Sequence, residues 1–210
     1  MRRRLKGTVC IVLGTLLVLS ALLLTGYNLI TEEQATQSTN DALEQLEDKI
    51  PQVEESDLMP GISNHPEVAL PDYVQNPDME MPTVNINGWN YIGVLEIYEL
   101  GLSLPVVTEW SYSALRVAPA RYCGSAYTND LVIAAHNYNT HFGNIKELKP
   151  GAELQFTDVD GNVFSYEVVA VEVLVPTAVE EMTSGEWDLS LFTCTVGGSY
   201  RVTVRCNLRE

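Results

Sequence analysis

The 210-residue sequence has few cations, few cysteines and few aromatic residues, and each shortage excludes a class of protein. Twelve Lys and Arg residues against 28 Asp and Glu residues give a formal charge of -16. This balance argues against a nucleic-acid partner, because such proteins bind phosphate through Lys and Arg. Four cysteines are too few for a disulfide-dense scaffold. The hydrophobic share of 46%, with only 8% aromatic residues, excludes collagen-like and fully disordered chains.

Charge is absent from the 25 residues between Lys6 and Glu32. The core of this stretch, residues 9–24, is rich in Leu, Val and Ile and as a helix would span about 30 Å of hydrocarbon. A cleaved signal peptide is the alternative, but its apolar part usually has about 7–15 residues before a small-x-small site. We therefore predict a basic start and transmembrane anchor over residues 1–30. Four of the twelve cations precede Gly7, which predicts a cytoplasmic N-terminus and an extracytoplasmic remainder.

Residues 31–82 carry many carboxylates, a single cation, Lys49, and six of the ten prolines. Such a segment buries little apolar surface, so we predict an acidic, Pro-rich extracytoplasmic spacer that acts as a flexible tether. A helix over residues 41–50 is possible, and Pro51 would end it. His65 is interpreted as a solvated loop residue.

The remaining residues, 83–210, have the size of one domain. Short runs of Val, Ile and Tyr separated by turn residues predict a mainly β barrel or sandwich. The predicted strands are 91–97, 102–107, 131–135, 153–157, 164–175, 189–194 and 200–206. Residues 158–162 are a hairpin turn, and only 111–117 and 145–149 indicate brief helical turns.

Three residues that can carry chemistry lie at strand ends. A tight hairpin after Cys194 puts Arg201 beside it, whereas Arg205 lies about 13 Å further along the strand. His136 reaches the same rim as Cys194 if their two strands are parallel. A thiolate beside an imidazolium is a nucleophile, the imidazolium can protonate a leaving amine, and a guanidinium can hold an oxyanion. A Cys in a β-rich segment is, however, more often a small buried residue, so spacing alone leaves its role open.

The residues around these positions resemble sortases. Two segments carry the resemblance: Ser190-Leu191-Phe192-Thr193-Cys194 with Arg201, which is similar to the TLxTC signature and its downstream Arg, and Ala134-Ala135-His136-Asn137, which is similar to the His segment. Residues 91–97 and 142–151 are also similar to the family's first strand and to its stretch after the His. Ser190 departs from the motif's Thr but keeps a hydroxyl.

The resemblance implies a closed β-barrel of about eight strands with a few short helices and a cysteine transpeptidase of Gram-positive surfaces. In that reading Cys194 attacks an LPXTG-type sorting motif, His136 protonates the departing amine and Arg201 steadies the oxyanion. The implied partners are surface proteins or pilins with a C-terminal sorting signal. An amine from a peptidoglycan precursor or a pilin Lys then resolves the thioacyl enzyme, and no cofactor is needed.

Calcium is a minor alternative in this reading. Some relatives bind it near the loop before the Cys strand, where Glu180, Glu181 and Glu186 are candidate ligands, although hard-ion sites need six or more oxygens. That loop is short, unlike the long insertion of class B members. No second apolar span follows Arg205, so we expect a single N-terminal anchor.

The sequence leaves open the roles of several other residues and two alternative functions. Cys123 and Cys206 either pair or are two buried thiols, and we favour the thiols. His141 is interpreted as a structural or substrate-side loop residue, because His-x4-His with His136 is not a recognised metal spacing. An L,D-transpeptidase-like enzyme and a non-catalytic tethered binding module remain alternatives, although the Cys of the former follows Gly rather than Thr.

Overall fold

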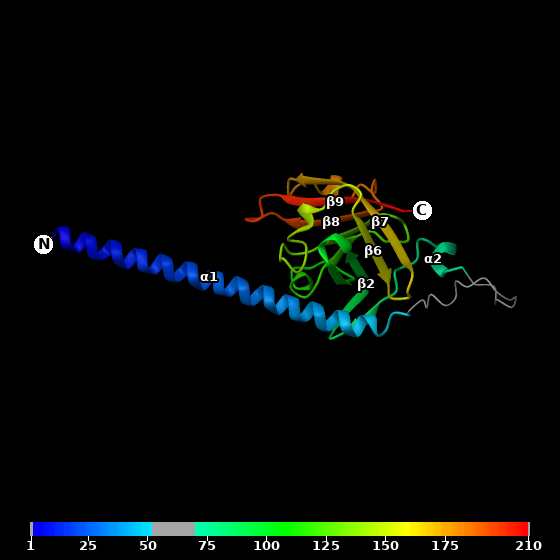
Figure 1. Ribbon diagram of the computed structural model, residues 1–210, viewed down its shortest axis with the longest axis horizontal. Helices are drawn as coiled ribbons and strands as arrows, with labels where there is room; N and C mark the ends of the chain where they lie inside the picture. Colours follow the sequence, from blue (N-terminus) through cyan, green and yellow to red (C-terminus); the bar gives the residue numbers. More distant parts are fainter. Residues whose placement is uncertain (1, 52–69, 210) are drawn as a thin grey trace.

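A computed structural model describes residues 2–51 and 70–209 of the chain, with side chains from residue 11 onward (Figure 1). Three α-helices are present in these ranges: α1 (Arg2–Glu47), α2 (Asp72–Gln75) and α3 (Val179–Met182). Three single 3-10 turns are η2 (Tyr98–Leu100), η3 (Ala114–Arg116) and η4 (Ile145–Glu147). The strands are β1 (Val84–Ile86), β2 (Trp89–Ile97), β3 (Leu102–Val107), β4 (Ala120–Cys123), β5 (Leu131–Ala134), β6 (Glu153–Asp158), β7 (Val163–Leu174), β8 (Leu189–Cys194) and β9 (Arg201–Leu208).

Eight of these strands form a closed barrel. Their order is β2-β3-β4-β5-β8-β9-β7-β6, and the barrel closes because β6 also pairs with β2. The short β1 extends the start of β2 as a hairpin. Only the pairs β3–β4 and β5–β8 are parallel. The predicted mainly β, sortase-type barrel of about eight strands is therefore confirmed, and sequence missed only β1 and β4, which have three and four residues.

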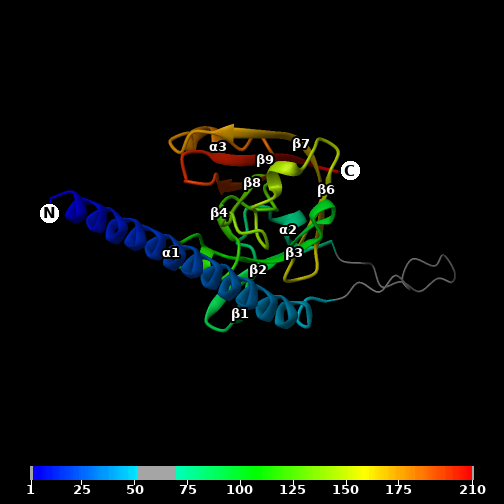
Figure 2. The same cartoon turned by 60° about the vertical axis from the view of Figure 1, so that its left-hand side comes forward.

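Helix α1 is one continuous helix of 46 residues with two different halves. In the first half, apolar side chains from Ile11 to Ile30 are exposed. This part is long and apolar enough to cross a membrane, and by length and composition it fits either an anchor or a signal sequence. In Figures 1 and 2 it projects away from the barrel.

The second half of α1 packs on the barrel, beside β1, β2 and β3 (Figure 2). Its buried face consists of Ala35, Thr39, Ala42 and Leu46, spaced by four, three and four residues. This spacing follows the α-helical period and brings all four to one face. Ala42 and Leu46 join a hydrophobic cluster with strands of the barrel.

The structure thus differs from a flexible tether at both ends of the predicted spacer. Helix α1 runs to Glu47, and residues after the undescribed stretch pack through Tyr73, Met79 and Met81 against the main core. The physical reason is that the packed face before Leu46 consists of Ala35, Thr39 and Ala42, which are too small or too polar for a hydrophobic pattern to detect. The predicted solvated loop at His65 lies outside the described residues, and the division into segments 1–30, 31–82 and 83–210 stays a prediction.

Replacing Leu46 with alanine tests this packing. Leu46 is fully buried, so we expect the substitution to lower the free energy of unfolding by about 2–4 kcal/mol. The exposed neighbour Gln45 is the control, and Gln45→Ala is expected to change stability by less than about 0.5 kcal/mol. Thermal unfolding of the full chain in detergent micelles measures both. Equal stability of the two variants would mean that α1 does not pack on the barrel.

Candidate active site

Strands β5 and β8 bring His136 and Cys194 to one rim of the barrel. The two strands are parallel and in register to the end of β5, as predicted. Beyond it, the Ala135 amide donates to the Phe192 carbonyl (3.2 Å), and the Thr193 hydroxyl donates to the Ala135 carbonyl (2.8 Å). Thr193, the residue before Cys194, is therefore hydrogen-bonded to Ala135, the residue before His136.

The β8–β9 hairpin brings Arg201 to the same rim. Arg201 pairs directly with Cys194 across the two strands, which confirms the predicted hairpin geometry. Its Nη1 donates to the carbonyls of Gly198 and Tyr200, each at 3.1 Å. These bonds anchor one nitrogen of the guanidinium to the turn, while Nε and Nη2 make no hydrogen bond to the described residues. The latter two remain available to a substrate oxygen.

All three predicted residues line one cavity of about 250 Å³. One wall is aromatic: Trp110 packs against Tyr112 and Tyr122, with ring centroids 5.2 and 5.7 Å apart, and Tyr122 packs against Phe192 at 5.2 Å. The lining also includes Val175, Pro176, Ala178, Val179 and Met182. An apolar cavity with few polar groups beside a nucleophile suits an extended apolar peptide segment. The sequence did not predict this aromatic wall.

The imidazole of His136 is half-buried, and its surroundings favour the neutral form. Burial lowers the pKa of His136, and the nearby positive charge of Arg116 lowers it further. The ring of Tyr138 lies beside it, with centroids 4.9 Å apart and planes at 40°. A neutral imidazole close to a thiol can take its proton, which is the first requirement for a Cys nucleophile.

Arg205 lies away from this rim and has a structural environment. It pairs with Ser190 in the strand register, and its side chain is 3% exposed. Its guanidinium donates to the Glu172 carboxylate (2.7 Å), to the Ser190 hydroxyl (2.8 Å) and to the Glu181 carbonyl (2.9 Å). Arg205 thus links β7, β8 and the α3 segment. The Ser190 hydroxyl accepts one of these hydrogen bonds.

His141 is fully buried beneath helix α1, which sequence reasoning did not anticipate. The Thr39 hydroxyl donates its only proton to the Val117 carbonyl (2.8 Å) and therefore accepts from Nε2 of His141 (2.9 Å). Nδ1 of His141 has no hydrogen-bond partner among the described residues. This arrangement fits a neutral ring, since only a protonated ring would bury an unpaired N–H. The structure thus favours the structural interpretation of His141 over a metal ligand.

A loss of stability on acidification should follow from this burial. Burial, followed by the influence of His136, lowers the pKa of His141 to about 4. An unfolded His takes up its proton near its ordinary pKa of about 6.5, so the unfolded state binds more protons between these values. Stability is therefore full above pH 6.5 and is lost as pH falls towards 4, by about 3 kcal/mol. Thermal unfolding at pH 7, 6 and 5 measures the slope, and His141→Gln should flatten it. An unchanged slope in that variant would contradict the assignment.

A second cavity, of about 430 Å³, also has His136 in its lining. Helix α1 supplies Tyr27, Asn28, Thr31 and Glu32 to its lining, and the barrel supplies Arg116, His136, Asn137 and Tyr138.

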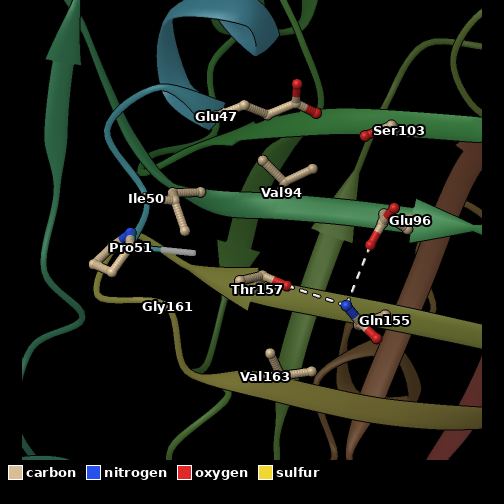
Figure 3. Close-up of a pocket in the computed structure, with 10 residues that line it drawn as sticks. All are labelled: Glu47, Ile50, Pro51, Val94, Glu96, Ser103, Gln155, Thr157, Gly161 and Val163. Carbon is tan, nitrogen blue, oxygen red and sulfur yellow. Dashed lines mark hydrogen bonds between the residues drawn. The ribbon is translucent and has the colours of Figure 1, made fainter. Parts of the chain in front are cut away.

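A third and larger cavity of about 480 Å³ lies between the end of α1 and strands β2 and β6 (Figure 3). Gln155 lies within it and donates to the carboxylate of Glu96 (3.3 Å) and to the hydroxyl of Thr157 (3.4 Å). Its lining has no Cys, His, Lys or Arg. It therefore offers neither a thiol nor an imidazole, and it contains none of the predicted site residues.

Metal-binding clusters are absent from the described part of the chain, where no three His, Cys, Asp or Glu side chains converge. Glu180, Glu181 and Glu186 are exposed, and calcium binding remains the minor alternative given above. The cysteines described, Cys123, Cys194 and Cys206, are all free. Cys206 is buried as expected, but Cys123 is partly exposed.

Comparisons with known proteins agree with this geometry. A family model described as "Sortase domain" matches residues 95–209. Among solved structures, the sortase D5 transpeptidase of Clostridium perfringens has a TM-score of 0.59 at 19% identity, covering 83% of this chain and 99% of that one. Sortase A from Corynebacterium diphtheriae, as a lid mutant, has a TM-score of 0.51 at 21% identity, covering 65% and 75%.

Sortase C1 of GBS pilus island 1 also matches, with a TM-score of 0.49 at 19% identity and 57% coverage of this chain. This chain spans 64% of that protein's length. A comparison with curated proteins gave no match. At these identities, the two structures with TM-scores of 0.59 and 0.51 support the fold.

Proposed function

The chain belongs to the sortase family, and from this we propose that it is a cysteine transpeptidase with Cys194 as nucleophile, His136 as proton carrier and Arg201 as oxyanion ligand. One observation carries the proposal: the parallel β5–β8 pair and the β8–β9 hairpin bring these three residues to one apolar cavity. Four residues of backbone separate Arg205 from this rim, and its donors are engaged elsewhere, which supports Arg201.

In the first half-reaction, His136 takes the proton of Cys194, and the thiolate attacks a peptide carbonyl. The carbonyl oxygen gains negative charge, which Arg201 stabilises through Nε and Nη2. His136 then donates its proton to the departing amine as the C–N bond breaks. A thioester between Cys194 and the acyl part of the substrate remains.

In the second half-reaction an amine attacks this thioester, so that one amide bond replaces another. The substrate class we propose is an LPXTG-like sorting motif of secreted surface proteins or pilins, whose apolar residues would lie between the aromatic wall and residues 175–182. The acceptor is an amine of a peptidoglycan precursor or of a pilin Lys. The residues of the site supply the nucleophile, acid and oxyanion ligand, so we propose no cofactor.

The same account proposes a single-pass protein of a Gram-positive cell membrane with a cytoplasmic N-terminus. The charge-free stretch in α1 and the cations before Gly7 support it. The catalytic domain then lies outside the cell, where sorting substrates and wall precursors occur.

A panel of fluorescence-quenched LPXTG-type peptides tests the reaction class. The full chain in detergent micelles is incubated with each peptide, with and without a short glycine peptide as amine. We expect cleavage of at least one motif and, with the amine, a product that joins the acyl fragment to the glycine peptide. Cleavage that yields only the free acid at every amine concentration would indicate a hydrolase. Binding without cleavage across the panel would favour a tethered binding module.

A further inference from the structure

Two cavities share one lining residue, which is His136. The first contains Cys194 and Arg201 and is the proposed place of the peptide donor. The second lies between helix α1 and the loop after β5. The proposed reaction has two substrates, and His136 must exchange a proton with each in turn. In the second half-reaction the acyl part of the donor still occupies the first cavity, so the amine needs its own approach to His136.

The α1 wall of the second cavity is held in place by three consecutive loop residues. The Asn139 amide donates to Oε1 of Glu32 (2.9 Å), the hydroxyls of Thr140 and Thr36 are 2.9 Å apart, and His141 bonds to Thr39. Residues 32, 36 and 39 lie on one face of the helix, because their spacing follows the helical period. The cavity is consequently a built space, and its volume of about 430 Å³ is sufficient for a small ligand.

The position of this cavity along α1 relates it to the membrane. Tyr27, Asn28 and Thr31 are the last polar residues of the charge-free stretch, and Glu32 is the first charge after it. In both views the turn between β8 and β9 lies on the side towards which α1 projects (Figures 1 and 2). If α1 spans the bilayer, this cavity opens at the level of the lipid headgroups.

The lining of the cavity suits a primary amine. Oε1 of Glu32 is used by Asn139, but Oε2 makes no hydrogen bond to the described residues and can accept from an ammonium. Arg116 on the opposite side makes no ion pair with Glu32 or with another described residue. Its guanidinium is available for an anionic group of the same ligand.

We propose that this cavity is the acceptor site, which takes an amine carried at the membrane surface, with Glu32 holding its ammonium. The assignment rests on the proposed function. The bound ammonium first releases one proton to solvent, and the nitrogen then attacks the thioester carbon while His136 takes a second proton. A C–N bond forms, the C–S bond breaks, and the Cys194 thiolate and His136 imidazolium are restored.

Single-turnover measurements on the full chain in nanodiscs separate the two substrates. The enzyme is first mixed with donor peptide alone to give the rate of thioacyl formation, and a glycine-peptide amine is then added at increasing concentrations. The amine is supplied either free or attached to a phospholipid headgroup in the same nanodisc. Glu32→Gln keeps an acceptor for the Asn139 amide and removes the charge, and Asn28→Trp fills the cavity.

Both variants are expected to raise the amine concentration for half-maximal capture at least 10-fold, with thioacyl formation unchanged within twofold. The matched controls, Glu33→Gln and Gln34→Trp, are on exposed positions of the same helix and should resemble the wild type within twofold. The lipid-borne amine should react at concentrations at least 10-fold lower than the free amine in the wild-type enzyme, and this advantage should be smaller in Asn28→Trp.

Three results would overturn the assignment. Capture unchanged in both cavity variants would mean that the acceptor enters elsewhere. A parallel loss of thioacyl formation and capture would mean that the α1 contacts position His136 and hold no acceptor. Equal use of free and lipid-borne amine would contradict a membrane-borne acceptor. In contrast, a wild-type enzyme that forms no thioacyl species with any donor would contradict the proposed function itself.

Discussion

Replacing Cys194 with alanine is expected to reduce transpeptidation by at least about 10,000-fold, the largest effect of any single substitution in this site. The physical reason is that Cys194 supplies the only thiol among the residues that line this cavity, and the hydroxyl of the neighbouring Thr193 is used to bond the Ala135 carbonyl. The measurement is the initial rate of amide product formation from donor peptide and amine.

The control for this substitution is Cys123→Ala. Cys123 ends β4, is partly exposed and does not line the cavity that contains His136. We expect its activity to stay within about twofold of the wild type. If Cys123→Ala lost as much activity as Cys194→Ala, or if Cys194→Ala kept a tenth of the rate, the nucleophile would have to be sought elsewhere.

Arg201→Ala and Arg205→Ala are expected to fail in different ways. Loss of an oxyanion ligand costs about 100- to 1,000-fold in kcat, so Arg201→Ala should be slow but stably folded. Arg205→Ala removes a buried guanidinium from Glu172, Ser190 and Glu181, which should lower the free energy of unfolding by about 2–3 kcal/mol. This figure allows for the partial exposure of Glu172, which weakens its ion pair.

The two variants are compared by kcat, KM and thermal midpoint on the full chain. Arg201→Lys is a further control, because it keeps the charge but loses the planar fork of donors. We expect Arg201→Lys to recover only part of the rate. Equal loss of kcat in Arg201→Ala and Arg205→Ala, at equal stability, would contradict the assignment of the oxyanion ligand to Arg201.

Much of the barrel was predictable because its strands are short runs of β-branched residues bounded by turns. The bounds of β3 and β8 agree with the prediction to the residue. The short hairpin after Cys194 was sufficient to predict that Arg201 lies beside Cys194 on the neighbouring strand. The sequence placed His136 beside Cys194 only on the condition that β5 and β8 are parallel. The structure shows that they are.

The packing of α1 was harder to predict, although its buried residues follow the helical period in the sequence. Its buried face contains Ala35, Thr39 and Ala42, which are too small or too polar for an amphipathic pattern to emerge among acidic neighbours. Local composition therefore favoured a solvated spacer. Only the tertiary contacts, such as Thr39 with His141, show that this part of the helix belongs to the folded domain.

The cavity walls were not predictable for a different reason. Trp110 and Tyr112 follow β3 in an irregular segment, and they line the same cavity as Val179 because separate loops meet at the rim. No periodicity describes such loops. The burial of Arg205 has the same origin, since the alternation of β9 predicts two faces but not that the loop around Met182 covers one of them.

Intact-protein mass spectrometry of the full chain during turnover tests the central claim most directly. With a cleavable donor peptide and no amine, we predict a mass increase equal to the acyl fragment, located on Cys194 by peptide mapping. Addition of the glycine-peptide amine should remove this increase and yield the amide product in equal amount. Peptide cleavage without a covalent species, or an acyl group on any residue other than Cys194, would contradict a Cys194 thioacyl transpeptidase.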